Sequence, residues 1–225
     1  MAQIIAIGGA GFGTLENDYK MERYLIAQTG KTNPKVCFLG QASAESPAYA
    51  RLFHRTFKAL ETHPSTISLF GRVTPHWKTQ VLEQDLIFVG GGNTRSMLAL
   101  WREWGMDQIL KEAYDKGIVL CGSSAGAICW FEACVTDSVW PLGTLKGLGF
   151  LQGSCCPHYD SEPERRPTYL QKVQSGEIIP GIALEDYTAA HFVDGSLRTV
   201  VSAKAGTKAY RVSPDKETGL EVGLL

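Results

Sequence analysis

A short polar segment, Gly122-Ser123-Ser124-Ala125-Gly126, interrupts an apolar stretch of the chain and places two hydroxyls between two glycines. Residues 118–121 before it are typical of a buried strand, and the small and apolar residues after it are typical of a helix. The pattern G-x-S-x-G between a strand and a helix predicts a nucleophile elbow, in which the central serine is exposed at a sharp turn. Ser124 is therefore the predicted nucleophile, and the alternative is an ordinary serine N-cap.

A second glycine loop, GGGNT at residues 90–94, follows the apolar residues 86–89 and begins another predicted helix. Successive glycines let the backbone bend freely, and amides at a helix start lack carbonyl partners. Such a loop can hold a phosphate or serve as half of an oxyanion hole, and the alternative is a plain tight turn. The amide of Ala125 would supply the other half.

A serine hydroxyl needs a base within hydrogen-bonding reach, and the chain has five histidines that could serve. Three of them fit surface or boundary positions better, namely His54, His63 and His76. His158 follows a possible short strand, and Pro157 stiffens its approach, so it is the predicted base. His191 is the reserve.

The base in turn needs a carboxylate that orients its ring. Asp137 would give the chain order Ser, Asp, His, and Glu185, at the end of an apolar run, would give Ser, His, Glu. Triads occur in several chain orders, so position along the sequence does not choose between them. Asp186 is expected to face away from Glu185, because neighbouring side chains alternate along a strand.

Another glycine-rich segment, the first glycine loop at residues 8–13, does not match the dinucleotide-binding fingerprint, because Thr14 stands where the third glycine or alanine is needed. A turn that lets the backbone approach the site is the preferred interpretation. The six cysteines show no C-x-x-C pair and are expected to be buried free thiols. The neighbouring Cys155 and Cys156 would point to opposite faces, so they are poor joint metal ligands.

The elements that position these loops alternate along the chain, which predicts an α/β fold with a mostly parallel sheet sandwiched by helices. The expected strands are 4–7, 36–39, 67–70, 86–89 and 118–121, and the expected helices are 18–29, 47–61, 94–104, 106–114 and 163–174. From about residue 135 the pattern loosens, with strand-like pieces at 180–184, 189–193, 197–203 and 207–212. With 225 residues and no linker or repeat, the chain is expected to form a single domain, 1–225.

The composition excludes several function classes. The formal net charge is −1, which gives no basic field for nucleic acid or an anionic membrane. No signal peptide or long apolar span is visible, so a cytoplasmic location is expected.

The order and content of these motifs resemble the peptidase E (α-aspartyl dipeptidase) and cyanophycinase family of serine peptidases. The resemblance is carried by FVGGGNT at 88–94, GSSAGA at 122–127, Pro157-His158 and ALED at 183–186. It implies a class I glutamine amidotransferase-like fold. It also implies a triad of Ser124, His158 and Glu185, with oxyanion amides from Gly92 and Ala125.

The resemblance further implies a small peptide as substrate, with cleavage after an N-terminal aspartate. Asn93 and Arg166, or its neighbour Arg165, are the expected substrate-binding residues, because an arginine can clamp a carboxylate with two parallel hydrogen bonds. No metal or organic cofactor is expected, and the chain is expected to be a monomer or a homodimer. The alternatives are a cyanophycinase-like β-aspartyl peptidase, an amidase or esterase, and a non-catalytic binding protein.

Overall fold

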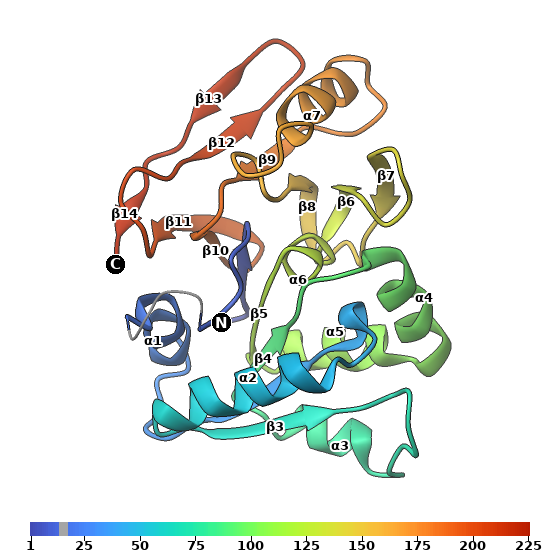
Figure 1. The fold of residues 1–225 in the computed structure, drawn as a ribbon, viewed down its shortest axis with the longest axis vertical. Coiled ribbons are helices and arrows are strands. Elements are labelled where there is room, and N and C mark those ends of the chain that lie inside the picture. The colour runs from blue at the N-terminus through green and yellow to red at the C-terminus, as the bar shows by residue number, and fades with distance from the viewer. Residues whose placement is uncertain (14–17) are drawn as a thin grey trace.

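Parallel strands form the centre of the larger of two sheets in the computed structural model, which describes residues 1–13 and 18–225 (Figure 1). Thr14 lies outside the described residues. Within them, this sheet has eight strands, in the order β14-β11-β10-β1-β5-β4-β2-β3. The run from β1 to β3 is parallel, and β10 and β11 add antiparallel strands. The bounds are β1 Gln3–Ile7, β2 Lys35–Leu39, β3 His63–Ile67, β4 Leu86–Val89, β5 Val119–Ser123, β10 Thr188–Val193, β11 Ser196–Ser202 and β14 Gly223–Leu224.

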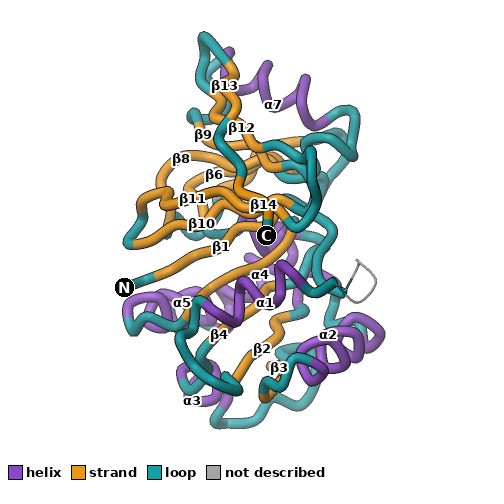
Figure 2. The backbone as a smooth tube through the Cα atoms, turned by 90° about the vertical axis from the view of Figure 1, so that its left-hand side faces the viewer, coloured by secondary structure: helices purple, strands orange, loops and turns teal. Residues whose placement is uncertain are grey.

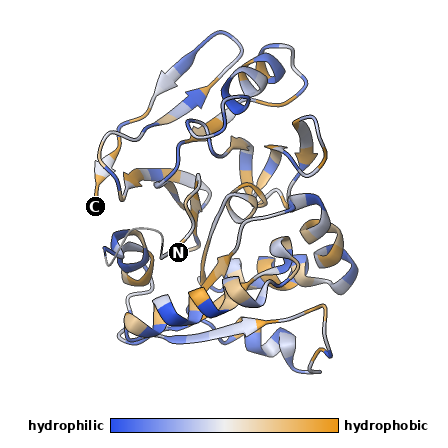
Figure 3. Ribbon diagram, viewed as in Figure 1, coloured by the Kyte–Doolittle hydropathy of each residue, from blue (hydrophilic) through white to orange (hydrophobic). Residues whose placement is uncertain are grey.

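Helices cover both faces of the parallel strands, as the sequence predicts. Phe53 and Phe57 of α2 pack on one face with residues of α1, and Leu98 and Trp101 of α4 pack on the other face with residues of α3 and α5. Hydrophobic and hydrophilic residues alternate along α2, which is typical of a helix with one buried side (Figure 3). The bounds are α1 Lys20–Ala27, α2 Pro47–Ala59, α3 Trp77–Leu82, α4 Thr94–Trp104, α5 Met106–Asp115, α6 Ala125–Ile128 and α7 Arg165–Gln174.

A second sheet of mixed direction lies beside the first (Figure 2). Among the described residues it has six strands, in the order β13-β12-β9-β8-β6-β7, of which β6, β8 and β9 run parallel. One apolar cluster includes residues of both sheets, so the two share a core. The bounds are β6 Phe131–Thr136, β7 Gly143–Lys146, β8 Leu151–Cys156, β9 Gly181–Leu184, β12 Ala209–Val212 and β13 Glu217–Gly219.

One strand, β3, lies earlier in the chain than its sequence pattern predicts. The strand after α2 is β3, and not residues 67–70, because His63 and Pro64 pair in parallel with Lys35 and Val36 of β2. A proline is tolerated there because, among the described residues, β3 is an edge strand with no strand on its outer side. The helix α3 and the strands β6 and β7 were not predicted.

All six cysteines are buried and free, as expected. Burial raises the pKa of the Cys37 thiol to about 12 and that of Cys134 to about 12, so neither carries a reactive thiolate near neutral pH. Over residues 1–13 and 18–225, no helix has the length and apolar character needed to cross a membrane.

Candidate active site

Ser124 lies at the turn between β5 and α6, in a backbone conformation that few side chains adopt (φ 56°, ψ −115°). The glycines on either side let this turn pack closely against β4. A Cβ atom on Gly126 would lie 2.0 Å from the carbonyl oxygen of Val89, and one on Gly122 would lie 2.5 Å from the same oxygen. The Ser124 amide also donates to the carbonyl of Ile7 at 3.1 Å. The strained, tightly packed elbow therefore has the form that the sequence predicts.

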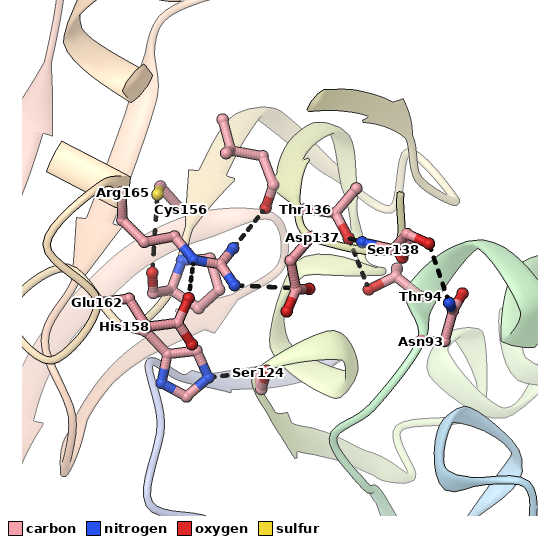
Figure 4. A network of polar contacts seen from close by, with 12 residues as sticks. Asn93, Thr94, Ser124, Thr136, Asp137, Ser138, Cys156, His158, Glu162 and Arg165 are labelled. Atoms are coloured by element: carbon pink, nitrogen blue, oxygen red, sulfur yellow. Dashed lines mark hydrogen bonds and ion pairs between the residues drawn. The ribbon is translucent and has the colours of Figure 1, made fainter. Parts of the chain in front are cut away.

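Two hydrogen bonds join Ser124, His158 and Asp186. The Oγ of Ser124 lies 2.9 Å from Nε2 of His158 (Figure 4), and Nδ1 of the same ring lies 2.8 Å from Oδ1 of Asp186. With a neutral imidazole, Nδ1–H donates to the carboxylate and Nε2 accepts the serine O–H. The His158 and Asp186 side chains are mostly buried, with 19% and 21% of their surface exposed. The arrangement can take a proton from Ser124 while a carboxylate stabilises the imidazolium that forms.

The hydrogen bond from His158 lowers the pKa of the Asp186 carboxyl, and partial burial opposes this shift. The carboxyl is therefore ionised at neutral pH, which is the state that can hold the imidazole by a charge-assisted hydrogen bond.

The prediction that Glu185 orients the histidine is wrong. The Glu185 carboxylate accepts from the amide of Lys208 at 2.7 Å and from the hydroxyl of Tyr210 at 3.2 Å. The strand β9 ends before Glu185, so the alternation of side chains along a strand no longer applies there. The chain turns at this point, with the Thr188 amide donating to the Glu185 carbonyl at 3.2 Å, and it is Asp186 that meets the ring.

Asp137, the other acid that the sequence suggested, does not orient the ring either. Both ring nitrogens of His158 are already occupied, by Ser124 and Asp186. The Asp137 carboxylate instead lies 3.5 Å from Nη2 of Arg165.

The first glycine loop forms the seat of the His158–Asp186 pair. The Gly8 carbonyl accepts from the His158 amide at 3.1 Å. A Cβ atom on Gly9 would lie 1.8 Å from Oδ1 of Asp186 and 2.5 Å from Nδ1 of His158, so only glycine leaves room for the pair. Phe12 is buried among aromatic side chains and anchors the loop. The interpretation of this loop as a turn that approaches the site is confirmed.

The second glycine loop packs against both Ser124 and the segment after β2. Gly92 has a φ of 136°, and a Cβ atom on it would lie 2.2 Å from the carbonyl oxygen of Ala42. That oxygen also accepts from the Asn93 amide at 2.8 Å. A Cβ atom on Gly91 would lie 3.3 Å from the Cβ of Ser124. The loop therefore passes directly beside the elbow.

The amides expected to bind an oxyanion are those of Gly92 and Ala125. Among the hydrogen bonds between described residues, neither amide donates to a protein acceptor. Both are therefore free to donate to a substrate oxygen, which is what an oxyanion hole requires.

The side chain of Asn93, an expected substrate-binding residue, caps α4. Its Oδ1 accepts from the amide of Ser96 at 2.9 Å, and its Nδ2 donates to the carbonyl of Ser138 at 3.1 Å. Both ends of the amide group therefore bind protein groups, and the observed contacts of Asn93 are structural.

Arg166, the other expected substrate-binding residue, is also engaged. Its guanidinium pairs with the carboxylate of Glu217 and lies over the rings of Tyr159 and Tyr210, 5.6 and 5.0 Å from their centroids. Glu217 belongs to β13, so these contacts fasten the C-terminal hairpin to α7.

Two further side chains, those of Ser123 and Asp160, support the site. The buried Oγ of Ser123 accepts from the amide of Gly11 at 3.1 Å and ties the elbow to the first glycine loop. Oδ1 of Asp160 accepts from the Asp186 amide at 2.9 Å and fixes the backbone that presents this carboxylate. The position of Asp160 two residues after His158 was the available signal.

His191, the reserve base, lies elsewhere in the larger sheet. Its ring nitrogens bond the hydroxyl of Tyr24 at 2.7 Å and Oε1 of Gln3 at 3.0 Å, and burial lowers its pKa. The remaining histidines occupy α2, β3 and the residue before α3, in line with their exclusion as the base.

An elbow serine on a covered parallel sheet, joined by an imidazole to a carboxylate, is the arrangement of a serine-type hydrolase. The model of peptidase family S51 matches residues 4–200, which is most of the chain. The chain therefore belongs to peptidase family S51 and is a serine-type peptidase.

A close relative supports this membership, and two solved structures share the fold. The uncharacterized peptidase YgaJ of Bacillus subtilis (strain 168) is 48% identical over 212 residues, covering 94% of this chain and 92% of that protein. A crystal structure of a peptidase from an acI-B1 Actinobacterium superposes with a TM-score of 0.75 at 18% identity, covering 99% of this chain and 95% of that one. A structure from Listeria monocytogenes EGD-e assigned to peptidase E gives 0.61 at 16% identity, covering 97% and 98%. At these identities the two structures show a shared α/β fold.

Proposed function

We propose that this peptidase hydrolyses short peptides after an N-terminal aspartate, with Ser124 as nucleophile, His158 as general base and Asp186 as the orienting acid. The observation that carries the mechanism is the pair of hydrogen bonds on the His158 ring, 2.9 Å to Ser124 and 2.8 Å to Asp186. The preference for aspartate is supported by the resemblance of the motifs to peptidase E. Arg166 would have to release Glu217 before it could clamp a substrate carboxylate.

In the proposed reaction, Ser124 attacks the scissile carbonyl while His158 accepts its proton. The amides of Gly92 and Ala125 donate to the oxyanion of the tetrahedral intermediate. His158 then protonates the leaving amine, and an acyl-enzyme remains on Ser124. A water molecule, activated by the same imidazole, releases the aspartyl product.

The decisive experiment compares the wild-type protein with Ser124→Ala on Asp-Xaa dipeptides. We expect turnover to fall to background while the circular dichroism spectrum and melting temperature stay close to those of the wild type. A serine-directed phosphonate should label the wild type at residue 124 and leave the variant unlabelled. Hydrolysis that persists in purified Ser124→Ala would rule the mechanism out.

A substrate panel tests the specificity separately from the mechanism. Asp-Xaa dipeptides should be cleaved faster than β-aspartyl peptides, simple amides and simple esters. A preference for β-aspartyl peptides would instead indicate a cyanophycinase-like activity, and a preference for esters or simple amides would indicate an esterase or amidase. Absence of both phosphonate labelling and turnover would indicate a binding protein.

We also propose a cytoplasmic location. The support is that all six cysteines are free thiols, which is typical of proteins in a reducing compartment. Recovery of the protein in a secreted fraction of the source cells would contradict it.

A further inference from the structure

Three neighbouring parallel strands of the smaller sheet each deliver an acid or a base at the same edge. His158 follows β8, and Asp186 follows β9. Asp137 follows β6, which pairs in parallel with β8 so that Cys134 faces Cys155. The strand β6 ends at Thr136 and β8 ends at Cys156, so Asp137 and His158 leave the same end of two neighbouring parallel strands. Because adjacent strands lie about 4.8 Å apart, Asp137 belongs to the same sheet edge as the proposed base.

A buried arginine fixes Asp137 from one side. Arg165 is only 2% exposed, and its Nε donates to Glu162 at 2.6 Å, its Nη1 donates to the Val135 carbonyl at 3.3 Å, and its Nη2 lies 3.5 Å from Asp137. Glu162 is itself bonded to the base, since its amide donates to the His158 carbonyl at 3.1 Å. The guanidinium is thus enclosed by protein acceptors and is not presented to a substrate. The charged group that remains accessible beside Arg165 is the Asp137 carboxylate.

The second glycine loop holds the same segment from the other side. The carbonyl of Ser138 accepts from Nδ2 of Asn93 at 3.1 Å, and its hydroxyl accepts from the amide of Arg95 at 3.1 Å. In Figure 4, Asp137 stands between Arg165 and the Ser138–Asn93 pair. Asp137 therefore lies between the proposed base and the proposed oxyanion loop.

Asp137 also has fewer protein partners than the other carboxylates at this edge of the sheet. Asp186 bonds the imidazole, Asp160 bonds the Asp186 amide, and Glu185 bonds Lys208 and Tyr210. Among the contacts of the described residues, the Asp137 carboxylate has its 3.5 Å approach to Arg165, and the side chain is 57% exposed. Its oxygens are therefore able to accept hydrogen bonds from a cationic ligand.

We propose that Asp137 binds the α-ammonium group of the substrate's first residue, and this inference rests on the proposed function above. In a peptide cleaved after its first residue, the ammonium group is separated from the scissile carbonyl by a single carbon, so it must lie beside the nucleophile. A carboxylate there forms charge-assisted hydrogen bonds with it. Blocked amino termini and internal peptide bonds lack this cation. Asp137 thereby makes the enzyme cleave at free amino termini.

The test uses two substrates that differ only in the amine. Asp-Leu carries it, and succinyl-Leu keeps the same amide bond and side-chain carboxylate without it. For Asp137→Asn, we expect the ratio of kcat/KM for Asp-Leu to that for succinyl-Leu to fall roughly 10- to 100-fold, the range for losing a hydrogen bond between charged groups. Asp137→Glu should recover part of the ratio. Asp115→Asn is the matched control, because Asp115 is 58% exposed and pairs with a surface lysine of α5. It should leave the ratio unchanged.

A binding measurement keeps the inference separate from the mechanism. Calorimetric titration of Asp-Leu and succinyl-Leu into Ser124→Ala should show tighter binding of Asp-Leu, and adding Asp137→Asn should remove that difference. Equal losses on both ligands, or no loss on either, would overturn the role of Asp137. Turnover that persists in Ser124→Ala would overturn the proposed mechanism and leave the comparison of the two ligands intact.

Discussion

The two sheets contribute to the site in different ways. The larger sheet supplies Ser124 and the second glycine loop from tight turns at the ends of β5 and β4, and the glycines that shape those turns are adjacent in sequence to the groups they position. The smaller sheet supplies His158 and Asp186 from loops whose supports come from distant parts of the chain, including Gly8 and Gly9. The first half of the site is a product of local backbone geometry, and the second half is a product of packing between sheets.

This difference explains why the elbow was predicted correctly and the carboxylate that meets His158 was not. A turn such as G-x-S-x-G has steric requirements that its own residues reveal. Which acid meets the imidazole depends on how the chain leaves β9. There the backbone turns at Tyr187, which has a φ of 65°, so Glu185 and Asp186 do not point in the directions that a continuing strand would give them. Local rules therefore describe the nucleophile well and the acid poorly.

The largest expected effect comes from neutralising, one at a time, the two neighbouring acids Asp186 and Glu185. Asp186→Asn should lower kcat by roughly 10⁴-fold, because an amide cannot stabilise the imidazolium and favours the wrong tautomer of His158. Glu185→Gln, one residue away, should change kcat by no more than a few fold, because the Glu185 carboxylate accepts hydrogen bonds from the Lys208 amide and the Tyr210 hydroxyl and does not contact His158. Steady-state kinetics on the same dipeptide measures both. A larger loss of kcat in Glu185→Gln than in Asp186→Asn would show that Glu185 is the acid that orients His158.

The next largest effect on activity should come from adding a methyl group at Gly9, which packs against His158 and Asp186. Gly9→Ala places a Cβ atom where Asp186 and His158 now lie, and we expect kcat/KM to fall roughly 100-fold through displacement of the pair. Gly143→Ala in β7 is the control, because its nearest neighbour, the Pro141 carbonyl oxygen, is an ordinary 3.9 Å away. Phosphonate labelling of Ser124 should slow in the first variant and not in the second. Full activity of Gly9→Ala would show that the first glycine loop is not the seat of the pair.

The smallest expected effect concerns stability at low pH. The folded protein lowers the pKa of Asp186, so this carboxylate stabilises the fold fully above the value of an unfolded aspartate, about 3.9. The contribution is lost as the pH falls through the lower folded-state value. The difference in melting temperature between the wild type and Asp186→Asn should therefore shrink as the pH falls below about 4. A difference that stays constant or grows on acidification would contradict the cause given for the pKa shift. The elbow of the larger sheet carries no such ionisable group.

Much of the larger sheet could be predicted because its elements carry their own signals. The strands β1, β2, β4 and β5 are short apolar runs, and α2, α4 and α5 have apolar residues at helical spacing, so each was recognised within a few residues. The strand β3 was displaced because His63 and Pro64 are poor strand residues that pair only because β2 lies beside them.

The smaller sheet gave weaker signals. The strand β7 has one large apolar residue, Leu145, and β6 pairs both with β7, the next strand in the chain, and with β8, the strand after that. The side chains of Asn93 and Arg166 have partners that are distant in the sequence. Their polar character suggested substrate binding, and partners on other elements, Ser138 and Glu217, occupied them instead.

The sequence by itself determined the elbow serine, the glycine loops beside it, the histidine that contacts it and the family, because each depends on the conformational freedom of glycine or on residues close together in the chain. Only the tertiary structure decided which carboxylate meets His158, and that Gly9 makes room for the pair. The reason is physical: the direction of a side chain after a strand ends is set by the surfaces that pack against it, and those surfaces come from the other sheet.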